Sequence, residues 1–236
     1  MKPLYKRILL KLSGEGLMGD KPFGMDDGVI RSLAAQINQV RNLGVEICMV
    51  VGGGNIFRGA KEASKGLDRS VADQVGMLAT VMNALYLQNA LEKLGIEARV
   101  LSGLSIPEVC EDYIYRRALR HLQKNRVLIF AAGTGCPYFT TDTGAALRAS
   151  EMKCDALLKA TQVDGVYDAD PKQNADAVKY NEISYDEVIA KGLKVMDLTA
   201  VSLAKDNRIP IVVFAQKGEN ALLNAVTGQG EFTIIK

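Results

Sequence analysis

Short apolar runs rich in Val, Ile and Leu recur along the chain, with helical patterns between most of them. The runs predict strands at residues 7–12, 45–51, 97–102, 126–131, 155–160, 209–214 and 231–235. The segment after the first run repeats apolar residues at helical spacing, for example at Ile30, Leu33, Ile37 and Val40. This alternation predicts βαβ units.

Strands that are apolar along their whole length are usually buried on both faces. The sequence therefore predicts an α/β fold, a three-layer αβα sandwich with a mostly parallel central sheet. The last run closely follows Gly228 and Gly230 and is expected to be an antiparallel edge strand. Residues 163–181 are expected to form a long polar loop. Since no repeat or Pro/Ser-rich linker divides the chain, we treat residues 1–236 as a single domain.

The charge balance argues against a nucleic-acid partner. The chain has 29 Lys and Arg against 27 Asp and Glu, whereas proteins that neutralise a nucleic-acid backbone need a clear basic surplus. Arg116, Arg117 and Arg120 fall on a predicted helix without aromatic residues that could stack on bases, and are expected to form a solvated basic face.

Histidine and cysteine usage excludes several chemistries. A single histidine, His121, argues against a His-rich zinc site and against Ser-His catalysis. The four cysteines include no C-x-x-C pair, so reduced thiols are expected. The first apolar stretch is interrupted at Lys11 and is too short for a signal sequence or a membrane span. We therefore expect a cytoplasmic protein with no membrane partner.

Candidate chemistry collects where the predicted strands end. In open α/β sheets, ligands bind beyond the carboxyl ends of the strands. The first run ends in Lys11, Ser13 and Gly14, which suits a phosphate contact. The alternative is a lysine at the sheet edge whose ammonium group reaches solvent.

The second run ends in three consecutive glycines, followed by Arg58. Without Cβ atoms, Gly52, Gly53 and Gly54 let backbone N–H groups approach a phosphate, and Arg58 can add a bidentate contact. The alternative is an ordinary turn between strand and helix. The segment matches neither a Walker A loop nor a Rossmann glycine motif.

Two later strands end in polar loops. After residues 126–131 come glycines and threonines that could bind a base or a second phosphate, and Thr141 or Asp142 is expected to cap the next helix. After residues 155–160 come Thr161 and a loop containing Asp164, Asp168 and Asp170. Carboxylates near bound anions are unfavourable unless they hold a metal ion or sugar hydroxyls, so at least two of these three are expected only to form turns.

Two further expectations concern single helices. Asp197 precedes a helical stretch and is expected to be an N-cap. Met77, Leu78 and Met82 lie in a long helical stretch and are expected to belong to the core.

Five segments in order along the chain, KLSGE, VVGGGNIFRG, GTGCPYFTTD, KATQVDGVYDADP and KVMDLTA, resemble motifs of the amino acid kinase family and, within it, of the bacterial uridylate kinases. The resemblance extends over essentially the whole chain. It implies the amino acid kinase fold and transfer of the γ-phosphoryl group of ATP to UMP, which yields UDP and ADP in pyrimidine nucleotide biosynthesis.

The resemblance also implies site residues. In the family, Lys11 stabilises the transferring phosphoryl group, while Asp142 and Asp197 match acidic positions that orient Lys11 and the associated Mg²⁺. Asp73 matches the carboxylate that binds the ribose hydroxyls. The implied ATP-binding residues are Lys11, Ser13, Gly14, Gly54, Arg58, Thr161, Tyr167 and Asp170. The implied UMP-binding residues are Gly53, Arg58, Asp73, Thr134, Gly135, Cys136, Pro137, Tyr138, Phe139, Thr140 and Thr141. No metal ligands are assigned.

The chain departs from the family pattern at two places. Cys136 stands where the family usually has Asn, so a hydrogen bond to the acceptor nucleotide is lost or replaced by a backbone contact. Gln88 and Glu92 stand where enterobacterial members carry basic residues that bind the effector GTP, although Arg99 and Arg126 lie nearby. The resemblance implies a homohexamer and leaves the response to GTP and UTP open.

The scarcity of histidine agrees with the implied reaction. The second pKa of a phosphate monoester is about 6, so the UMP phosphate is mostly dianionic at pH 7 and needs no general base. A carboxylate acceptor such as acetylglutamate or aspartate needs none either. Asp73 and the threonine-rich segment favour a ribose and a base over such a substrate. A third possible function is that of a non-catalytic nucleotide sensor. Such a protein should lack Lys11 or the two acidic residues Asp142 and Asp197, all of which are present in this chain.

Overall fold

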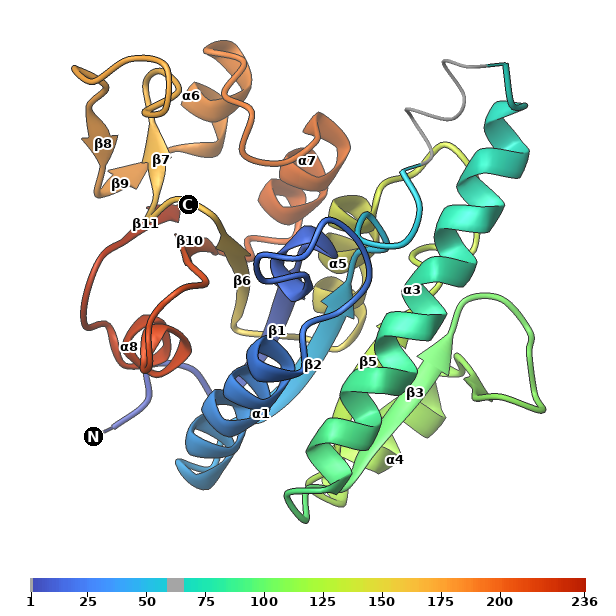
Figure 1. The fold of residues 1–236 in the computed structure, drawn as a ribbon. Helices are drawn as coiled ribbons and strands as arrows, with labels where there is room; N and C mark the ends of the chain where they lie inside the picture. Colours follow the sequence, from blue (N-terminus) through green and yellow to red (C-terminus); the bar gives the residue numbers. More distant parts are fainter. Residues whose placement is uncertain (1, 59–65) are drawn as a thin grey trace.

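The computed structural model describes residues 2–58 and 66–236 and contains a nine-stranded sheet in the order β4-β3-β5-β2-β1-β6-β10-β11-β9 (Figure 1). Gly59, the last residue of the second family motif, lies outside the described residues. The strands of this sheet are β1 (Arg7–Leu12), β2 (Glu46–Val51), β3 (Ala98–Ser102), β4 (Glu111–Asp112), β5 (Val127–Ala131), β6 (Ala156–Thr161), β9 (Glu182–Ile183), β10 (Ile211–Ala215) and β11 (Phe232–Ile235). Each of the seven predicted strands is present.

Helices cover both faces of the sheet. They are the 3-10 helix η1 (Glu15–Leu17) and the α-helices α1 (Asp27–Asn42), α3 (Arg69–Glu92), α4 (Tyr115–Gln123), α5 (Thr141–Glu151), α6 (Tyr185–Ala190), α7 (Leu198–Asp206) and α8 (Ala221–Thr227). In Figure 1, α1 and α3 lie in front of the sheet, whereas α4 and α5 lie behind it.

Alternate residues of the central strand β1 belong to two separate hydrophobic cores. Ile8 and Leu10 pack in the core that contains residues of α1, α3 and α8. Leu9 packs in the other core, with residues of α4, α5 and α7. Side chains of a strand alternate between its faces, so a strand that is apolar throughout can fill both cores. The predicted three-layer αβα sandwich is confirmed.

The sheet is parallel except between β10 and β11. The antiparallel orientation expected for residues 231–235 is therefore confirmed. Their expected position at the edge is wrong, because the short strand β9 pairs with the outer side of β11.

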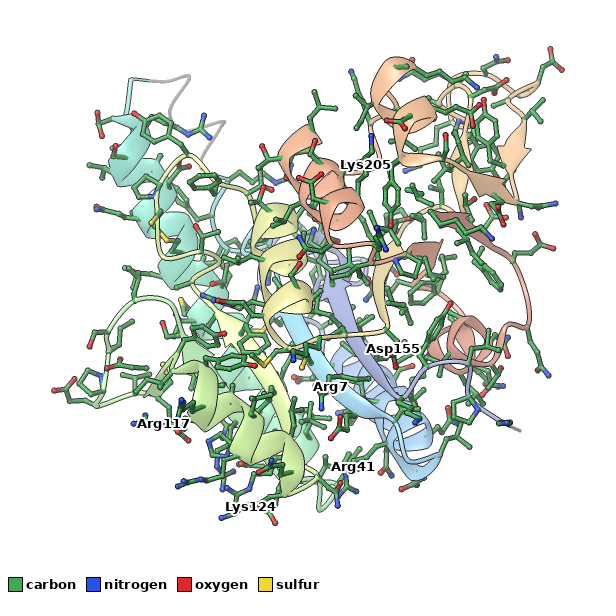
Figure 2. The ribbon with its side chains drawn as sticks, turned by 180° about the vertical axis from the view of Figure 1, so that it is seen from behind. Arg7, Arg41, Arg117, Lys124, Asp155 and Lys205 are labelled. Atoms are coloured by element: carbon green, nitrogen blue, oxygen red, sulfur yellow. The ribbon has the colours of Figure 1, made fainter. Side chains whose placement is uncertain are left out.

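The amino ends of β1 and β6 are joined by Asp155, whose carboxylate accepts the backbone N–H groups of Lys6 at 2.6 Å and Arg7 at 2.9 Å (Figure 2).

The region expected to be one long polar loop contains a small hairpin. Strands β7 (Val166–Tyr167) and β8 (Lys179–Tyr180) pair antiparallel as a separate two-stranded sheet. Strands of two residues are too short for a hydrophobic pattern to reveal, which is why the polar composition of this region indicated only a loop.

Helix α3 has apolar residues on two sides. Met77 is buried as expected, but the core position expected for Leu78 and Met82 is wrong, since these side chains are 48% and 53% exposed. They form an outward stripe at helical spacing, which comprises Val71, Val75, Leu78, Met82 and Tyr86. Among the described helices, none combines the length and the apolar character that crossing a membrane requires.

Candidate active site

Two lysines and one carboxylate meet at the carboxyl ends of the central strands. Lys11 on β1 and Lys159 on β6 are register partners. Their ammonium groups lie 2.6 Å from the two carboxylate oxygens of Asp142, which belongs to the first turn of α5. Lys11 is buried and lies on a central strand, so the alternative of a solvated lysine at the sheet edge is wrong. Asp142 pairs with both ammonium groups, and the carboxylate of Asp197 also acts on Lys159.

The charges in this cluster affect one another. Burial opposes ionisation of Asp142, but the two neighbouring ammonium groups outweigh it and lower the pKa of this carboxyl group. Burial also lowers the pKa of Lys159, and Asp142 counteracts only part of that effect. Two ammonium groups at one point can donate hydrogen bonds to an anion that enters the site.

Lys159 is a candidate functional residue that the sequence reasoning missed. It is the only charged residue in the strand ALLKAT, two positions before Thr161. A lysine in an otherwise apolar central strand is rare, since burial of an unpaired ammonium group is unfavourable. That position was the signal that could have revealed it.

Asp197 lies beside this cluster and joins two helix starts. As expected, it caps α7 by accepting the N–H of Ala200 at 2.9 Å. It also accepts hydrogen bonds from the hydroxyls of Thr140 and Thr143, the second at 2.9 Å. The N-cap of α5 is Thr140, which accepts the N–H groups of Asp142 and Thr143, so the expected caps Thr141 and Asp142 are wrong by one or two positions.

The glycines after β1 and β2 let two loops pack backbone against backbone. An added Cβ at Gly14 would lie 2.6 Å from the backbone nitrogen of Gly54, and one at Gly53 would lie 2.8 Å from the Cβ of Ala79 on α3. Gly54 has no such neighbour within 3.4 Å. Close packing therefore explains Gly14 and Gly53, while Gly54 has the open space that a ligand phosphate needs. Ser13 accepts the N–H of Gly16 at 3.1 Å and so helps to shape the first loop.

A pair of buried asparagines supports the second loop. Asn55 lies in the second loop and Asn83 on α3. Their side-chain amides donate hydrogen bonds to each other, at 3.0 Å from Asn55 and at 2.7 Å from Asn83. Asn55 also donates to the carbonyl of Gly24, and Asn83 to that of Gly52. The amide groups are thus satisfied, and the loop that leads to Arg58 is fixed to α3.

Arg58 lies between the two loops and is about half exposed. Its guanidinium group is 2.9 Å from a carboxylate oxygen of Glu15, and its Nε donates to the carbonyl of Gly54 at 3.3 Å. An exposed ion pair of this kind contributes little to stability. Arg58 can therefore exchange Glu15 for an anionic ligand at small cost.

A cavity of about 200 Å³ lies between α3 and the loop after β5. The residues implied for UMP that line it are Gly53, Asp73, Thr134, Cys136, Phe139, Thr140 and Thr141; Gly54 lines it as well. Gly135, Pro137 and Tyr138 belong to the same loop but are not among the lining residues. Asp73 fixes this loop to α3, since its Oδ2 accepts the N–H of Tyr138 at 2.8 Å and lies 2.9 Å from the Nε of Arg69.

The residues implied for ATP form a second group, connected to the lysine cluster through β6. Thr161 ends β6, and its hydroxyl exchanges hydrogen bonds with the backbone of Val163. Tyr167 on β7 donates its hydroxyl to Asp164 at 2.6 Å. Asp170 accepts the N–H of Lys172 at 3.0 Å and so forms a local turn, whereas Asp168 accepts the N–H of Val178 at 2.8 Å and connects the two sides of the hairpin.

The residues at which the chain departs from the family pattern are also placed. Cys136 is exposed. Its backbone N–H donates a hydrogen bond to the hydroxyl of Thr134, and this hydroxyl donates one to the backbone carbonyl of Cys136. Gln88 donates to Glu92 at 3.0 Å, and the guanidinium group of Arg99 is 3.7 Å from Glu92. Arg126 is paired with Glu97 at 2.7 Å.

The sole histidine and the basic helix lie away from the strand ends that form the site. His121 on α4 lies 3.1 Å from Glu111 and takes no part in the lysine cluster. Arg116, Arg117 and Arg120 are exposed on α4, which confirms the expected solvated face; Figure 2 labels Arg117 on this helix. In the part of the chain that the structure describes, no group of three or more potential metal-ligating side chains gathers.

Comparison with known proteins agrees with this geometry. The model of the "Amino acid kinase family" matches residues 6–215, which include the lysine cluster, both glycine loops and the hairpin. The chain belongs to the amino acid kinase family. This match accounts for the order of the five motifs and for the arrangement of the sheet.

Relatives within the amino acid kinase family are similar over almost their full length. A uridylate kinase of Paramagnetospirillum magneticum is 58% identical over 231 residues, which cover 98% of this chain and 96% of the relative. A uridylate kinase of Hyphomonas neptunium is 60% identical, with 98% and 92% covered. The crystal structure of UMP kinase from Ureaplasma parvum is 37% identical with a TM-score of 0.94, and 100% of each chain is covered.

Proposed function

We propose that this amino acid kinase family member transfers the γ-phosphoryl group of ATP to UMP and forms UDP and ADP. The observation that carries the proposal is a pair of lysines, the buried Lys11 and the partly buried Lys159, on either side of Asp142 and between two groups of nucleotide-binding candidates. The uridylate kinases that match over nearly the whole chain support the same reaction.

The acceptor side is assigned to the cavity beside α3. UMP would place its ribose hydroxyls on Asp73 and its phosphate near Gly53 and Arg58. The remaining acceptor residues are proposed to be Thr134, Gly135, Cys136, Pro137, Tyr138, Phe139, Thr140 and Thr141. Backbone and hydroxyl groups of this loop suit the edges of a base, since they can both donate and accept.

The donor side is assigned to the loops around the hairpin and β1. ATP would contact Thr161, Tyr167 and Asp170, and its phosphates would reach Ser13, Gly14, Gly54 and Arg58. Lys11 then lies where the two phosphate chains meet. This arrangement leaves the transferring group over the carboxyl ends of β1 and β6.

The mechanism needs positioning and charge compensation. The UMP phosphate dianion attacks the γ-phosphorus, the bond from that phosphorus to the β–γ bridging oxygen breaks, and ADP leaves with the electron pair. Lys11 and Lys159 donate hydrogen bonds to the oxygens on which negative charge collects. Asp142 holds both ammonium groups in place.

Mg²⁺ is proposed to arrive with ATP. The described residues offer no cluster of ligands, which agrees with the usual binding of Mg²⁺ by nucleotide phosphates, water and one or two carboxylates. Asp197 fits that role: its hydrogen-bond donors Thr140, Thr143 and Ala200 are neutral, so it keeps the negative charge that a cation needs. When bound, the ion would offset charge on the phosphate oxygens.

The proposed reaction is tested by an ADP-release assay with ATP, Mg²⁺ and one acceptor at a time. The acceptors are UMP, CMP, acetylglutamate and aspartate. Turnover with UMP and none with the two carboxylate acceptors is expected. Turnover with acetylglutamate or aspartate would instead assign the carboxylate-kinase reaction, and ATP binding without any turnover would favour a sensor.

We further propose that residues 1–236 form one domain that acts in the cytoplasm as a homohexamer. The outward apolar stripe of α3, which contains Leu78 and Met82, supports self-association, because contiguous exposed apolar surface commonly marks an interface. Analytical ultracentrifugation should show an oligomer for the wild type and smaller species for Leu78→Lys combined with Met82→Lys. A monomeric wild type at micromolar concentration would contradict this proposal.

A further inference from the structure

The β7–β8 hairpin carries Tyr167 and the turn with Asp170, yet it does not belong to the main sheet. Its register pairs Val166 with Tyr180 and Tyr167 with Lys179. An isolated two-stranded hairpin is only marginally stable in water. The hairpin must therefore be held by contacts with the rest of the chain if its side chains are to keep a fixed position.

The most buried of these contacts is made by one hydroxyl group. Thr233 lies on β11, and its side chain is fully buried. Its Oγ1 accepts the backbone N–H of Val166 at 2.8 Å and donates to the backbone carbonyl of Tyr180. A single hydroxyl thus satisfies one backbone group on each strand of the hairpin, as its one donor and two acceptor sites allow.

A glycine of the hairpin makes this approach possible. A Cβ added to Gly165 would lie 2.5 Å from Oγ1 of Thr233. That distance is shorter than real Cβ contacts, so any side chain at this position would push the hairpin away from the hydroxyl. Gly165 belongs to the segment DGVYDADP, and this contact gives it a physical role there.

The backbone N–H of Ile234 on β11 also donates to the carbonyl of Asn181, the residue after β8, at 3.0 Å. The ion-pair contact between the hairpin and the start of β11 is more exposed. Lys179 on β8 forms ion pairs with Asp164 at 3.2 Å and with Glu231, whose side chain is 71% exposed. Exposed ion pairs are screened by solvent and contribute little. Buried backbone groups that lose their hydrogen-bond partner are much more unfavourable. The Thr233 hydroxyl is therefore a stronger connection than these ion pairs.

We propose that Thr233 is a positioning residue, which fixes the β7–β8 hairpin on the sheet and thereby holds Tyr167 and Asp170 where they contact ATP. The inference rests on the proposed function, which assigns these two residues to the ATP side. The Thr233 hydroxyl bonds the hairpin backbone and acts on the nucleotide through it.

The test compares Thr233→Val, which keeps the shape and removes the hydroxyl, with Thr233→Ser, which keeps the hydroxyl. Thr233→Val should raise KM for ATP about tenfold or more, since loss of a buried partner destabilises the bound geometry. KM for UMP should change less than twofold, and Thr233→Ser should stay near the wild type. Amide hydrogen exchange should become faster in residues 163–181 of Thr233→Val and remain slow in β1.

Two further variants separate positioning from general destabilisation. Thr227→Val removes a hydroxyl that bonds only within α8 and should leave KM for ATP unchanged. Gly165→Ala leaves β11 intact and displaces the hairpin, so it should reproduce the effect on ATP even if Thr233→Val does not fold. An unchanged KM for ATP in a folded Thr233→Val or Gly165→Ala variant would overturn the inference, as would an equal rise in KM for UMP.

Failure of the proposed function would be visible separately. If the wild type does not phosphorylate UMP, the positioning role of Thr233 can still be tested. Titration calorimetry with ATP and amide hydrogen exchange of residues 163–181 then provide the readouts. Equal ATP affinity and equal exchange in the wild type and Thr233→Val would then reject it, whereas weaker ATP binding and faster exchange confined to the hairpin would support it.

Discussion

Lys11 and Lys159 lie opposite each other on adjacent parallel strands and share the carboxylate of Asp142. Side chains of register partners point to the same face of a sheet, so the pairing of β1 with β6 is what brings the two ammonium groups together. The ion pairs that Asp142 shares with both lysines are the physical basis of the first three predictions.

Lys11→Ala should lower kcat by about 100- to 1,000-fold while UMP binds nearly as in the wild type, because the contact of Lys11 strengthens mainly in the transition state. The ADP-release assay gives kcat, and titration calorimetry gives the UMP affinity. Lys6→Ala, in the exposed residue just before the same strand, is the matched control and should retain full activity. An unchanged kcat for Lys11→Ala would remove this residue from the mechanism.

Lys159→Met should also reduce kcat strongly while KM for UMP changes little, because methionine fills much of the same space without the charge. Stopped-flow or steady-state measurements of ADP release report the effect. Lys194→Met is a suitable control, since Lys194 is exposed. If Lys159→Met keeps wild-type kcat, Lys159 serves only to hold Asp142.

The lowered pKa of Asp142 predicts how this residue contributes to stability as the pH changes. The folded protein binds this proton less readily than the unfolded chain, so the contribution is complete above the ordinary value of 3.8 and is lost as the pH falls through the folded pKa. Urea unfolding should therefore show a large stability difference between the wild type and Asp142→Asn at pH 7. The difference should shrink in acid; a difference that stays constant would contradict the ion-pair account.

Arg58→Ala should weaken binding of the nucleotide phosphates roughly ten- to a hundredfold, the range expected when a hydrogen bond to a charged group is lost. Titration calorimetry with UMP and with ATP measures the change. Glu15→Gln removes the carboxylate that pairs with Arg58 at 2.9 Å, and should leave nucleotide binding equal or tighter. Wild-type UMP affinity in Arg58→Ala would exclude the proposed phosphate contact.

The sequence predicted the layers and the strands well, because hydrophobic periodicity records which faces are buried. It could not predict which strands become neighbours. The lysine in the strand ALLKAT stands out in the sequence, but its partnership with Lys11 becomes visible only once β6 is known to lie beside β1.

Two other differences between the predicted and the observed structure, the N-cap of α5 and the exposed apolar side of α3, also have specific causes. Thr140, Thr141 and Asp142 are all good cap residues, and only the backbone of Thr140 has the extended conformation of an N-cap. Leu78 and Met82 continue a helical apolar pattern, but one side of α3 faces the sheet and the other faces outward. Periodicity identifies an apolar stripe and does not say what covers it.

The contact between Gly14 and Asn55 has a consequence for how this site can change. The space that a side chain at position 14 would need is filled by the amide oxygen of Asn55, 2.5 Å from the missing Cβ. Since Asn55 is itself bonded to Asn83, it cannot withdraw without breaking that pair. A side chain at position 14 therefore requires simultaneous changes in the second loop and in α3, so a single substitution there cannot be accommodated locally.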